Sequence, residues 1–453
     1  MCTKARRSVQ QLGVRMAPVC AALALLSLTH LLVFGVAPIW TQPEQVHLSY
    51  AGPNSMVVTW TTFSKTQSRV EYGLVGGRLF EMKAEGNATL FVDSGAEKRH
   101  IFIHRVTLTD LKPAATYVYH CGGDEGWSDV FVFTALNDSL SFSPRFAFYG
   151  DLGNENPQSL ARLQQETQLS MYDVILHIGD FAYDMDEDDA RIGDEFMRQI
   201  QSIAAYVPYM TCPGNHEAAY NFSNYRNRFS MPGQTESLWY SWNLGSAHFI
   251  SFSTEVYFFP EYGMDLLFRQ YEWLKNDLEE ASKPENRALR PWIITMGHRP
   301  MYCSDDDQDD CTKFDSWVRL GRKDIKPPAP GLEDLFYNYG VDLELWAHEH
   351  TYERLWPVYG DKVYNGSTEH PYVNPKAPVH IIAGSAGCRE RTDRFNPNPR
   401  EWSAFRSTDY GYSRMQVVNA THLYLEQVSD DQYGKVIDST WIVKEKHGFS
   451  AWF

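Results

Sequence analysis

Between residues 43 and 137 the chain carries short runs in which apolar and polar positions alternate. The runs are rich in Val, Ile, Phe, Tyr, Trp and Thr, and Gly, Pro, Asn and Asp separate them, which predicts short β-strands. We expect strands at 46–50, 56–61, 69–72, 80–82, 101–108, 116–120 and 130–134. Met56, Val58 and Trp60 alternate onto one face, so that Trp60 is expected to anchor the core of a sandwich. No catalytic constellation is present in this stretch.

After a linker at 137–144 the pattern changes, and apolar runs alternate with helical periodicity. Continuous apolar runs predict buried strands, and wider spacing predicts helices. We expect strands at 146–149, 174–176, 209–211, 292–296, 341–346 and 379–382, and helices at 157–168, 194–205, 265–282 and 332–339. Residues 239–254 predict an antiparallel pair, and 414–418 and 422–428 predict two late strands. The predicted fold is a β-sandwich domain at 42–138 followed by an α/β domain at 139–453, with mixed sheets flanked by helices.

The N-terminus has the pattern of an export signal. Four basic residues (Lys4, Arg6, Arg7 and Arg15) precede an apolar stretch at 17–38, which predicts a signal peptide at 1–41, cut near 37–42. An uncleaved membrane anchor is the alternative, since the stretch is long enough to span a bilayer. Five Asn-x-Ser/Thr sites support export and are predicted glycosylation sites: Asn87, Asn137, Asn221, Asn365 and Asn419. The expected location is outside the cell, with the lysosome as the alternative.

Cysteine usage and charge limit the classes of function. Cys303 and Cys311 flank an acidic loop and are close enough to form a small ring, so we predict a disulfide between them in an oxidising compartment. The pairing of Cys121, Cys212 and Cys388 stays open. The formal net charge of −16 counts against binding to nucleic acid. A small anionic substrate would be repelled at long range, so local cations would have to attract it.

Polar residues that ligate metals follow the predicted strands of the second domain. Each comes after an apolar run and beside a Gly or Ala that permits a sharp turn: Asp151, Asp180, Asn215, His298, His348 and His350, with Tyr183 close behind Asp180. Carboxylates and imidazoles that meet at one sheet edge are costly to bury without cations. The plainer alternative is a set of unrelated helix caps and core histidines. Five such strand ends in about two hundred residues favour a metal centre.

The motifs that carry these residues resemble those of the metallophosphoesterases. Gly-Asp-x-Gly, Gly-Asp-x-x-Tyr, Gly-Asn-His-Glu, a single His and His-x-His occur in that order, and the Tyr is typical of the purple acid phosphatases. The resemblance extends over residues 43–445, including a front domain similar to the fibronectin type III sandwich, whose tyrosine corner is matched by Leu111-Lys112-Pro113 and Tyr117. The long-chain animal members are the most similar.

The resemblance implies a role for each ligand. Asp151, Asp180, Tyr183 and His350 would hold Fe(III), while Asp180, Asn215, His298 and His348 would hold a divalent zinc, iron or manganese ion. Hard oxygen donors suit a ferric ion, and imidazoles with an amide oxygen suit a borderline divalent ion. A metal-bound hydroxide would attack a phosphate monoester in line. His216 would contact the phosphoryl oxygens or the leaving group.

The chain departs from the family at the residues that follow His298. Plant members carry further histidines after the corresponding ligand, and residues 299–310 contain none. The proton donor to the leaving group is therefore either His216 or an Asp of 304–310.

The runner-up function is a phosphodiesterase or pyrophosphatase on the same scaffold. A protein phosphatase would have Gly-Asp-x-x-Asp-Arg-Gly at the second motif, which is absent here. A silent adhesion module is the third alternative. The expected partners are small phosphate monoesters, and a second copy of the chain is a candidate partner in a homodimer.

Overall fold

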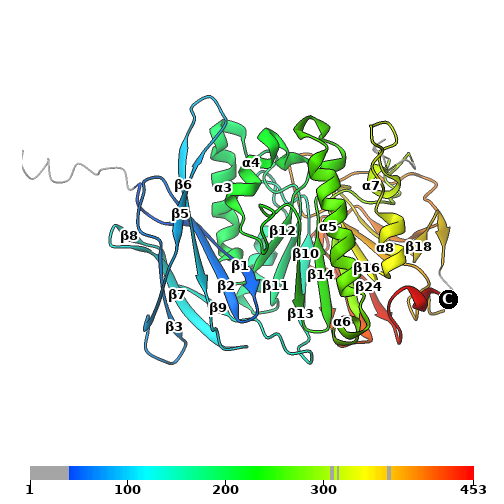
Figure 1. The fold of residues 1–453 in the computed structure, drawn as a ribbon, viewed down its shortest axis with the longest axis horizontal. Coiled ribbons are helices and arrows are strands. Elements are labelled where there is room, and N and C mark those ends of the chain that lie inside the picture. The colour runs from blue at the N-terminus through cyan, green and yellow to red at the C-terminus, as the bar shows by residue number, and fades with distance from the viewer. Residues whose placement is uncertain (1–39, 307–310, 314–315, 365–368) are drawn as a thin grey trace, which may run out of the picture. The chain divides into compact units, whose positions relative to one another are not determined.

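The computed structural model describes residues 40–306, 311–313, 316–364 and 369–453 (Figure 1). Most of the predicted signal peptide lies outside the described residues, and so does Asn365. Among the helices of the described part, none combines the length and the apolar character that a membrane span requires.

The first domain is a β-sandwich, as the alternating pattern predicted. One sheet has the order β1 (Glu44–Gly52), β2 (Ser55–Thr62), β6 (His100–Leu108) and β5 (Asn87–Val92). The other contains β4 (Met82–Glu85), β3 (Arg69–Leu74), β7 (Thr116–Gly123) and β8 (Gly126–Trp127), with β9 (Phe131–Thr134) paired to β7. Trp60 is fully buried between them. The Tyr117 hydroxyl accepts the Lys112 N–H at 2.9 Å, which is the contact expected of a tyrosine corner.

The strand expected at 80–82 is wrong by two residues, because Phe80 lies in a turn with φ of +53° and β4 starts at Met82. An aromatic residue in the left-handed region is uncommon. Phe80 was included in the predicted strand because it is apolar. Its ring is instead part of a turn and stacks on the ring of His120, with the centroids 4.2 Å apart.

Two mixed sheets form the second domain. The six-stranded sheet has the order β12 (Tyr209–Cys212), β11 (Val174–Ile178), β10 (Arg145–Tyr149), β22 (Gly411–Val417), β23 (His422–Ser429) and β24 (Lys435–Val443). The seven-stranded sheet has the order β13 (Tyr240–Leu244), β14 (Ala247–Ser251), β15 (Trp292–Met296), β16 (Leu343–Trp346), β20 (Val379–Ala383), β17 (Tyr352–Leu355) and β21 (Ser403–Ser407). A small hairpin, β18 (Val358–Tyr359) and β19 (Lys362–Val363), stands apart.

The central strands of both sheets are buried on both faces, which explains their continuous apolar runs. Strands β10, β11 and β12 are parallel to one another, as are β14, β15, β16 and β20. In each group the carboxyl ends of the strands therefore lie at one edge, which is where the candidate ligands follow.

The helices flank the sheets (Figure 1). They are α2 (Leu160–Gln168), α3 (Glu187–Ala204), α4 (Ala219–Arg228), α5 (Asp265–Ala281), α6 (Pro284–Leu289), α7 (Trp317–Leu320) and α8 (Glu333–Tyr339). The helix predicted at 265–282 is present as α5, and it packs one face into the core, where Leu267, Leu274 and Leu278 are buried. Helix α3 begins at Glu187, seven residues before the predicted start at 194. Its first residues therefore follow Tyr183 closely in the sequence.

The sandwich contains a buried histidine that makes its stability depend on pH. The ring of His104 stacks on Trp60 at 4.9 Å, and its two ring nitrogens lie 2.8 Å from the hydroxyls of Thr62 and Ser68. These neutral partners do not stabilise an imidazolium. Burial therefore lowers the pKa of His104 to about 4.

We expect the free energy of unfolding to fall as the pH drops from about 6.5 to 4. The unfolded chain takes up a proton at His104 near pH 6.5, while the folded chain resists it down to about pH 4, so the unfolded state binds more protons in this window. The contribution of this one group is about 3 kcal/mol. Urea unfolding of the wild type and of His104→Gln at pH 7 and pH 4 measures it. The variant should lose less stability on acidification, and an equal loss in both proteins would contradict the assignment.

Candidate metal centre

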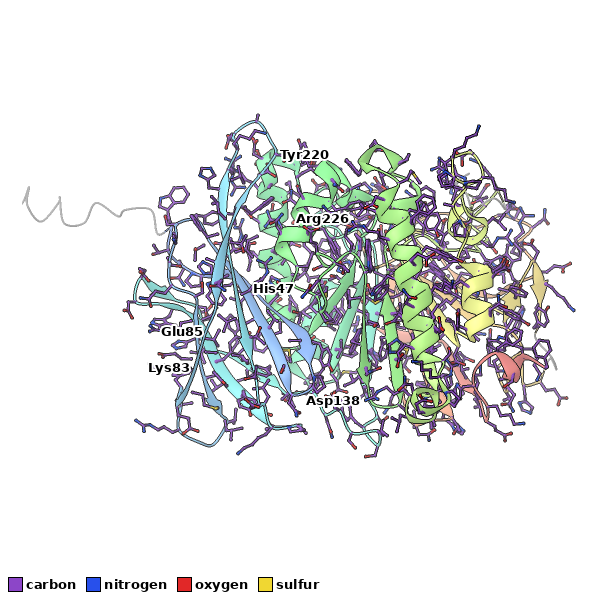
Figure 2. All side chains as sticks on the ribbon, in the orientation of Figure 1. His47, Lys83, Glu85, Asp138, Tyr220 and Arg226 are labelled. Carbon is purple, nitrogen blue, oxygen red and sulfur yellow. A yellow bond between two sulfur atoms is a disulfide. The ribbon has the colours of Figure 1, made fainter. Side chains whose placement is uncertain are left out.

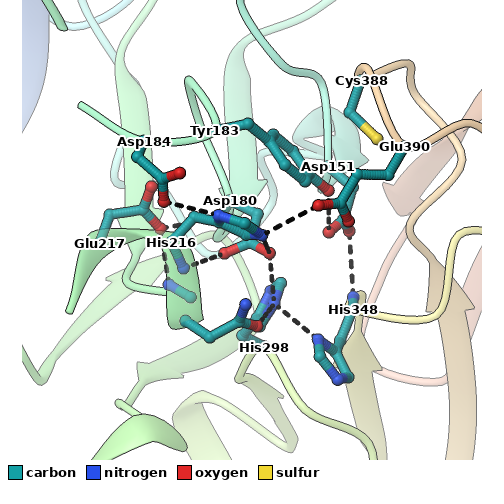
Figure 3. Close-up of polar contacts among 12 residues, drawn as sticks. Asp151, Asp180, Tyr183, Asp184, His216, Glu217, His298, His348, Cys388 and Glu390 are labelled. Carbon is teal, nitrogen blue, oxygen red and sulfur yellow. Dashed lines mark hydrogen bonds and ion pairs between the residues drawn. The ribbon is translucent and has the colours of Figure 1, made fainter. Parts of the chain in front are cut away.

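The candidate ligands follow strands of both sheets and meet between them (Figure 3). Asp151, Asp180 and Asn215 follow β10, β11 and β12 of the six-stranded sheet, and Tyr183 follows Asp180. His298 follows β15 of the seven-stranded sheet, and His348 and His350 lie between β16 and β17. Contacts link every one of the seven predicted ligands to at least one other.

One half of the centre surrounds the ring of His298. Its Nε2 lies 3.2 Å from Asp180 Oδ2, 3.2 Å from Asn215 Oδ1 and 3.2 Å from His348 Nδ1. Ligand atoms of Asp180, His298 and His348 all lie within 4.8 Å of one another. Ligand atoms at about 2.0–2.1 Å from a tetrahedral zinc ion are about 3.3 Å apart, which is close to the three distances from His298 Nε2.

The orientation of His298 also fits a metal ligand. Its Nδ1–H donates to the carbonyl oxygen of Ile178 at 2.9 Å. A backbone acceptor on one ring nitrogen leaves the lone pair of the other nitrogen available, which is the usual arrangement for a metal-bound histidine. The Nε2 lone pair therefore points toward Asp180 and Asn215.

The other half of the centre surrounds Tyr183. Its hydroxyl donates to Asp151 Oδ1 at 3.0 Å and lies 2.7 Å from His350 Nε2, which in turn is 3.5 Å from Asp151 Oδ1. The Nδ1–H of His350 donates to the carbonyl oxygen of Arg391 at 2.8 Å, so its Nε2 lone pair also faces inward. This half combines carboxylate, phenol and imidazole, the donor set predicted for a ferric ion.

The electrostatics of this half require a positive charge. Burial and the carboxylates of Asp151 and Asp180 raise the pKa of the Tyr183 phenol well above its usual value. Both carboxylates are themselves buried, at 0% and 1% exposure. A bound cation offsets these charges and allows the phenol to ionise, so the residues present fit a metal ion.

Four of the seven candidate ligands have a strained backbone. Asp151, Asp180, Tyr183 and His348 all have left-handed backbones, with φ of 59°, 52°, 51° and 71°. Such conformations cost about 1–3 kcal/mol each and cluster at functional sites. The turn after β12 needs a glycine, because a Cβ on Gly214 would lie 2.2 Å from Asp180 Oδ1. The surrounding structure therefore holds these residues in a costly backbone conformation, with their side chains in the metal centre.

His216 lies beside the candidate ligands. Its Nδ1–H donates to Asp184 Oδ1 at 2.7 Å, and its Nε2 is 3.8 Å from Glu390 Oε1 and 4.0 Å from Asp180 Oδ2 (Figure 3). Burial lowers the pKa of His216, but the carboxylates of Asp180 and Asp184 outweigh this effect and raise it to about 10. The imidazole is therefore oriented by Asp184 with its second nitrogen toward the metal centre.

Sequence reasoning missed Glu217. The buried Glu217 carboxylate accepts three backbone N–H groups, from Asp180 at 2.9 Å, Phe181 at 3.0 Å and Gly214 at 2.8 Å. It fixes the turns that carry two ligands, Asp180 and Asn215. The sequence did contain a signal for this role. Glu217 comes three residues after Gly214, which caps the short helix at Asn215–Glu217, and this is the spacing of a capping box. The carboxylate of Asp393, which accepts the His350 N–H at 2.7 Å, had no such signal.

The predicted disulfide between Cys303 and Cys311 is confirmed, with Cα atoms 5.6 Å apart. Cys311 Sγ lies 2.9 Å from Glu349 Oε1, and Glu349 stands between His348 and His350. The bond therefore supports the segment that carries two ligands. Cys121, Cys212 and Cys388 are buried and unpaired with other cysteines in the described part of the chain.

Comparison with known proteins agrees with this site. Three family descriptions match in order: "Purple acid Phosphatase, N-terminal domain" at 43–135, "Calcineurin-like phosphoesterase" at 144–352 and "Iron/zinc purple acid phosphatase-like protein C" at 377–439. The acid phosphatase type 7 of Danio rerio is 75% identical over 422 residues, which cover 93% of this chain and 95% of that protein. The chain belongs to the purple acid phosphatase family.

Further purple acid phosphatase relatives cover most of the chain. The human acid phosphatase type 7 is 58% identical over 407 residues, covering 90% of this chain and 92% of that protein. The purple acid phosphatase PPD1 from yellow lupin seeds has a similar structure, with a TM-score of 0.74 at 26% identity, over 89% of this chain and 75% of that chain. Membership confirms the resemblance that the motifs indicated and implies a binuclear metal centre.

Proposed function

We propose that this chain is an acid phosphatase that hydrolyses phosphate monoesters at a centre of two metal ions. The observation that carries the proposal is the meeting of ligands from two sheets, with Asp180, His298 and His348 within 4.8 Å and Asp151, Tyr183 and His350 in contact beside them. The family to which the chain belongs supports the same activity.

We assign Asp151, Asp180, Tyr183 and His350 to Fe(III), and Asp180, Asn215, His298 and His348 to a divalent zinc, iron or manganese ion. The donor chemistry supports this division, since the first set contains three oxygen donors and the second contains two imidazoles. When bound, the ions would supply a water of lowered pKa as nucleophile and would neutralise the phosphoryl oxygens. The protein holds the carboxylates, phenol and imidazoles in a preformed geometry.

His216 is proposed to bind the phosphoryl group or the leaving oxygen. Asp184 holds Nδ1–H, so Nε2 is the nitrogen that faces the centre. A hydrogen bond or a proton from Nε2 stabilises the negative charge that develops on the leaving oxygen. The described geometry supports His216 as the donor, since its Nε2 lies 4.0 Å from the ligand oxygen Asp180 Oδ2. Residues 307–310, which include most of the other candidates for this role, lie outside the described part of the chain.

We expect purified protein loaded with iron to be pink to purple, because a phenolate on Fe(III) absorbs visible light. Tyr183→Phe should abolish the absorption band, since it removes the phenolate while it keeps the ring. A visible spectrum with metal analysis measures both. A colourless wild type that carries its full metal content and is active would rule out the ferric-tyrosinate assignment.

Turnover of a monoester, a diester and pyrophosphate by the same preparation distinguishes the phosphatase from the alternatives on this scaffold.

We also propose the domain division at 42–138 and 139–453, which the matched family regions support, and export of the chain outside the cell or to the lysosome. The disulfide supports an oxidising compartment. Among the predicted glycosylation sites that the structure describes, Asn87 and Asn419 are exposed, and Asn137 and Asn221 are partly buried. We therefore expect the first two to be the more accessible to glycan attachment.

A further inference from the structure

The loop that joins β5 and β6 of the sandwich contacts the start of α3, a few residues behind Tyr183. Arg99 Nη1 donates to the carbonyl oxygen of Asp189 at 2.8 Å, and Nη2 donates to Asp194 Oδ2 at 2.6 Å. The Glu97 N–H donates to Asp189 Oδ1 at 2.8 Å. The sandwich thus binds this segment through both a side chain and a backbone group.

Asp194 is buried between two guanidinium groups. Arg228 Nη1 from α4 donates to Asp194 Oδ1 at 2.8 Å, opposite Arg99. Burial alone would raise the pKa of Asp194, but Arg228 and Arg99 outweigh it and hold the pKa below its usual range. Loss of one partner from a buried charge cluster leaves an uncompensated charge, so the cluster resists separation of its parts.

The segment that these arginines hold is strained. Asp188, Asp189 and Ala190 have φ of 49°, 50° and 65°, and three consecutive residues other than glycine rarely adopt this region. Such a backbone persists only where its surroundings fix it. Arg99 holds the carbonyl oxygen of Asp189, and Arg228 Nη2 donates to that of Ala190 at 2.9 Å.

The other end of the same segment reaches the metal centre. The Gly193 N–H donates to the carbonyl oxygen of Met185 at 3.2 Å and closes the stretch into a compact loop. Asp184, immediately before this loop, orients His216, and Tyr183 precedes it (Figure 3). A shift of residues 189–194 is therefore transmitted to Asp184 over a few bonds.

We propose that Arg99 of the sandwich is a positioning residue for Asp184, His216 and Tyr183, so that the first domain sets the geometry of the metal centre. This inference rests on the proposed phosphatase activity. It gives the sandwich a role in catalysis through Arg99, whose partners Asp189 and Asp194 are not metal ligands.

The test compares Arg99→Met with Arg105→Met in the full chain. Arg105 also reaches across from the sandwich, since its Nε donates to Ser230 Oγ at 2.7 Å and its Nη2 donates to the carbonyl oxygen of Asn227. Both acceptors lie at or beyond the end of α4 and outside residues 185–194. Each variant loses two arginine hydrogen bonds across the same pair of domains. The measurements are kcat and KM for p-nitrophenyl phosphate, the visible absorption band, and urea unfolding.

We expect Arg99→Met to lower kcat about tenfold or more with KM changed less than twofold, and to shift the absorption band, because small displacements of catalytic groups have large effects on rate. Arg105→Met should keep the wild-type kcat and band. Arg99→Lys, which keeps the charge, should recover part of kcat and tests the inference if the Met variant does not fold.

Two results would overturn the inference. One is an unchanged kcat and band in both Arg99 variants. The other is an equal fall of kcat in Arg99→Met and Arg105→Met in proportion to lost stability, which would indicate a purely structural role. An active wild type without a visible band would contradict the ferric assignment alone, since kcat still tests Arg99. An inactive, metal-loaded wild type would contradict the proposed function, and this inference with it.

Discussion

Replacing Asp180 with asparagine is expected to lower kcat/KM for p-nitrophenyl phosphate by about a thousandfold or more and to reduce the content of both metals. Asp180 is assigned to both ions, so the change removes a negative charge from each. Its Oδ2 lies 3.2 Å from His298 Nε2, and its Oδ1 accepts the His216 N–H at 3.0 Å. Loss of several kcal/mol of stabilisation by the metals corresponds to this reduction in rate.

Metal analysis and steady-state kinetics on the same preparation measure this effect. Asp173→Asn is the matched control, because Asp173 precedes β11 while Asp180 follows it, and Asp173 pairs with Arg145 away from the ligands. The control should keep its metals and its activity. An Asp180→Asn protein with two equivalents of metal and normal turnover would show that the centre is not built around this carboxylate.

The second large effect is expected for His216→Gln. We expect kcat to fall about 10²- to 10⁴-fold, the usual contribution of a positioned general acid, while the metal content stays unchanged. His216 is not assigned as a metal ligand, and its imidazole Nδ1 is held by Asp184 at 2.7 Å. Glutamine keeps a polar group of similar reach but transfers no proton.

A substrate with a better leaving group separates the two roles proposed for His216. If the imidazole protonates the leaving oxygen, the loss in kcat should be smaller for an aryl phosphate than for an alkyl phosphate. An equal loss for both would assign His216 to binding of the phosphoryl oxygens. His120→Gln is the control, since that histidine lies in the sandwich and pairs with Glu71. A His216→Gln protein with unchanged kcat on both substrates would remove His216 from the mechanism.

The sequence allowed prediction of the central strands and of the residues that follow them. Strands β10, β11, β15, β16 and β20 are buried on both faces, so their apolar runs are continuous and easy to recognise. Asp151, Asp180 and His298 each follow such a run after a single glycine. The contacts of Asp180 with His298 and of Asp151 with the backbone N–H of His348 show that these strand ends lie close together. The tyrosine corner at Tyr117 was recognisable because its local spacing is fixed.

Other features depend on contacts between distant parts of the chain and had no local signal. The edge strand β24 was missed because its positions are mostly exposed or half-buried, without a clear apolar face. Asp393 and Arg391, which hold His350 through its N–H and its Nδ1, lie some forty residues away in a loop without periodicity. The contact of Arg99 with Asp194 joins two domains, and only the folded chain brings the two residues together.

The division of the ligands between the two sheets has a consequence for the life of the protein in the cell. Bound metal ions would link the two sheets. One sheet would supply Asp151, Asp180 and Asn215, and the other would supply His298, His348 and His350. Binding free energy then adds directly to folding free energy. Chains made under metal starvation would therefore be fragile as well as inactive, and their abundance would follow the metal supply.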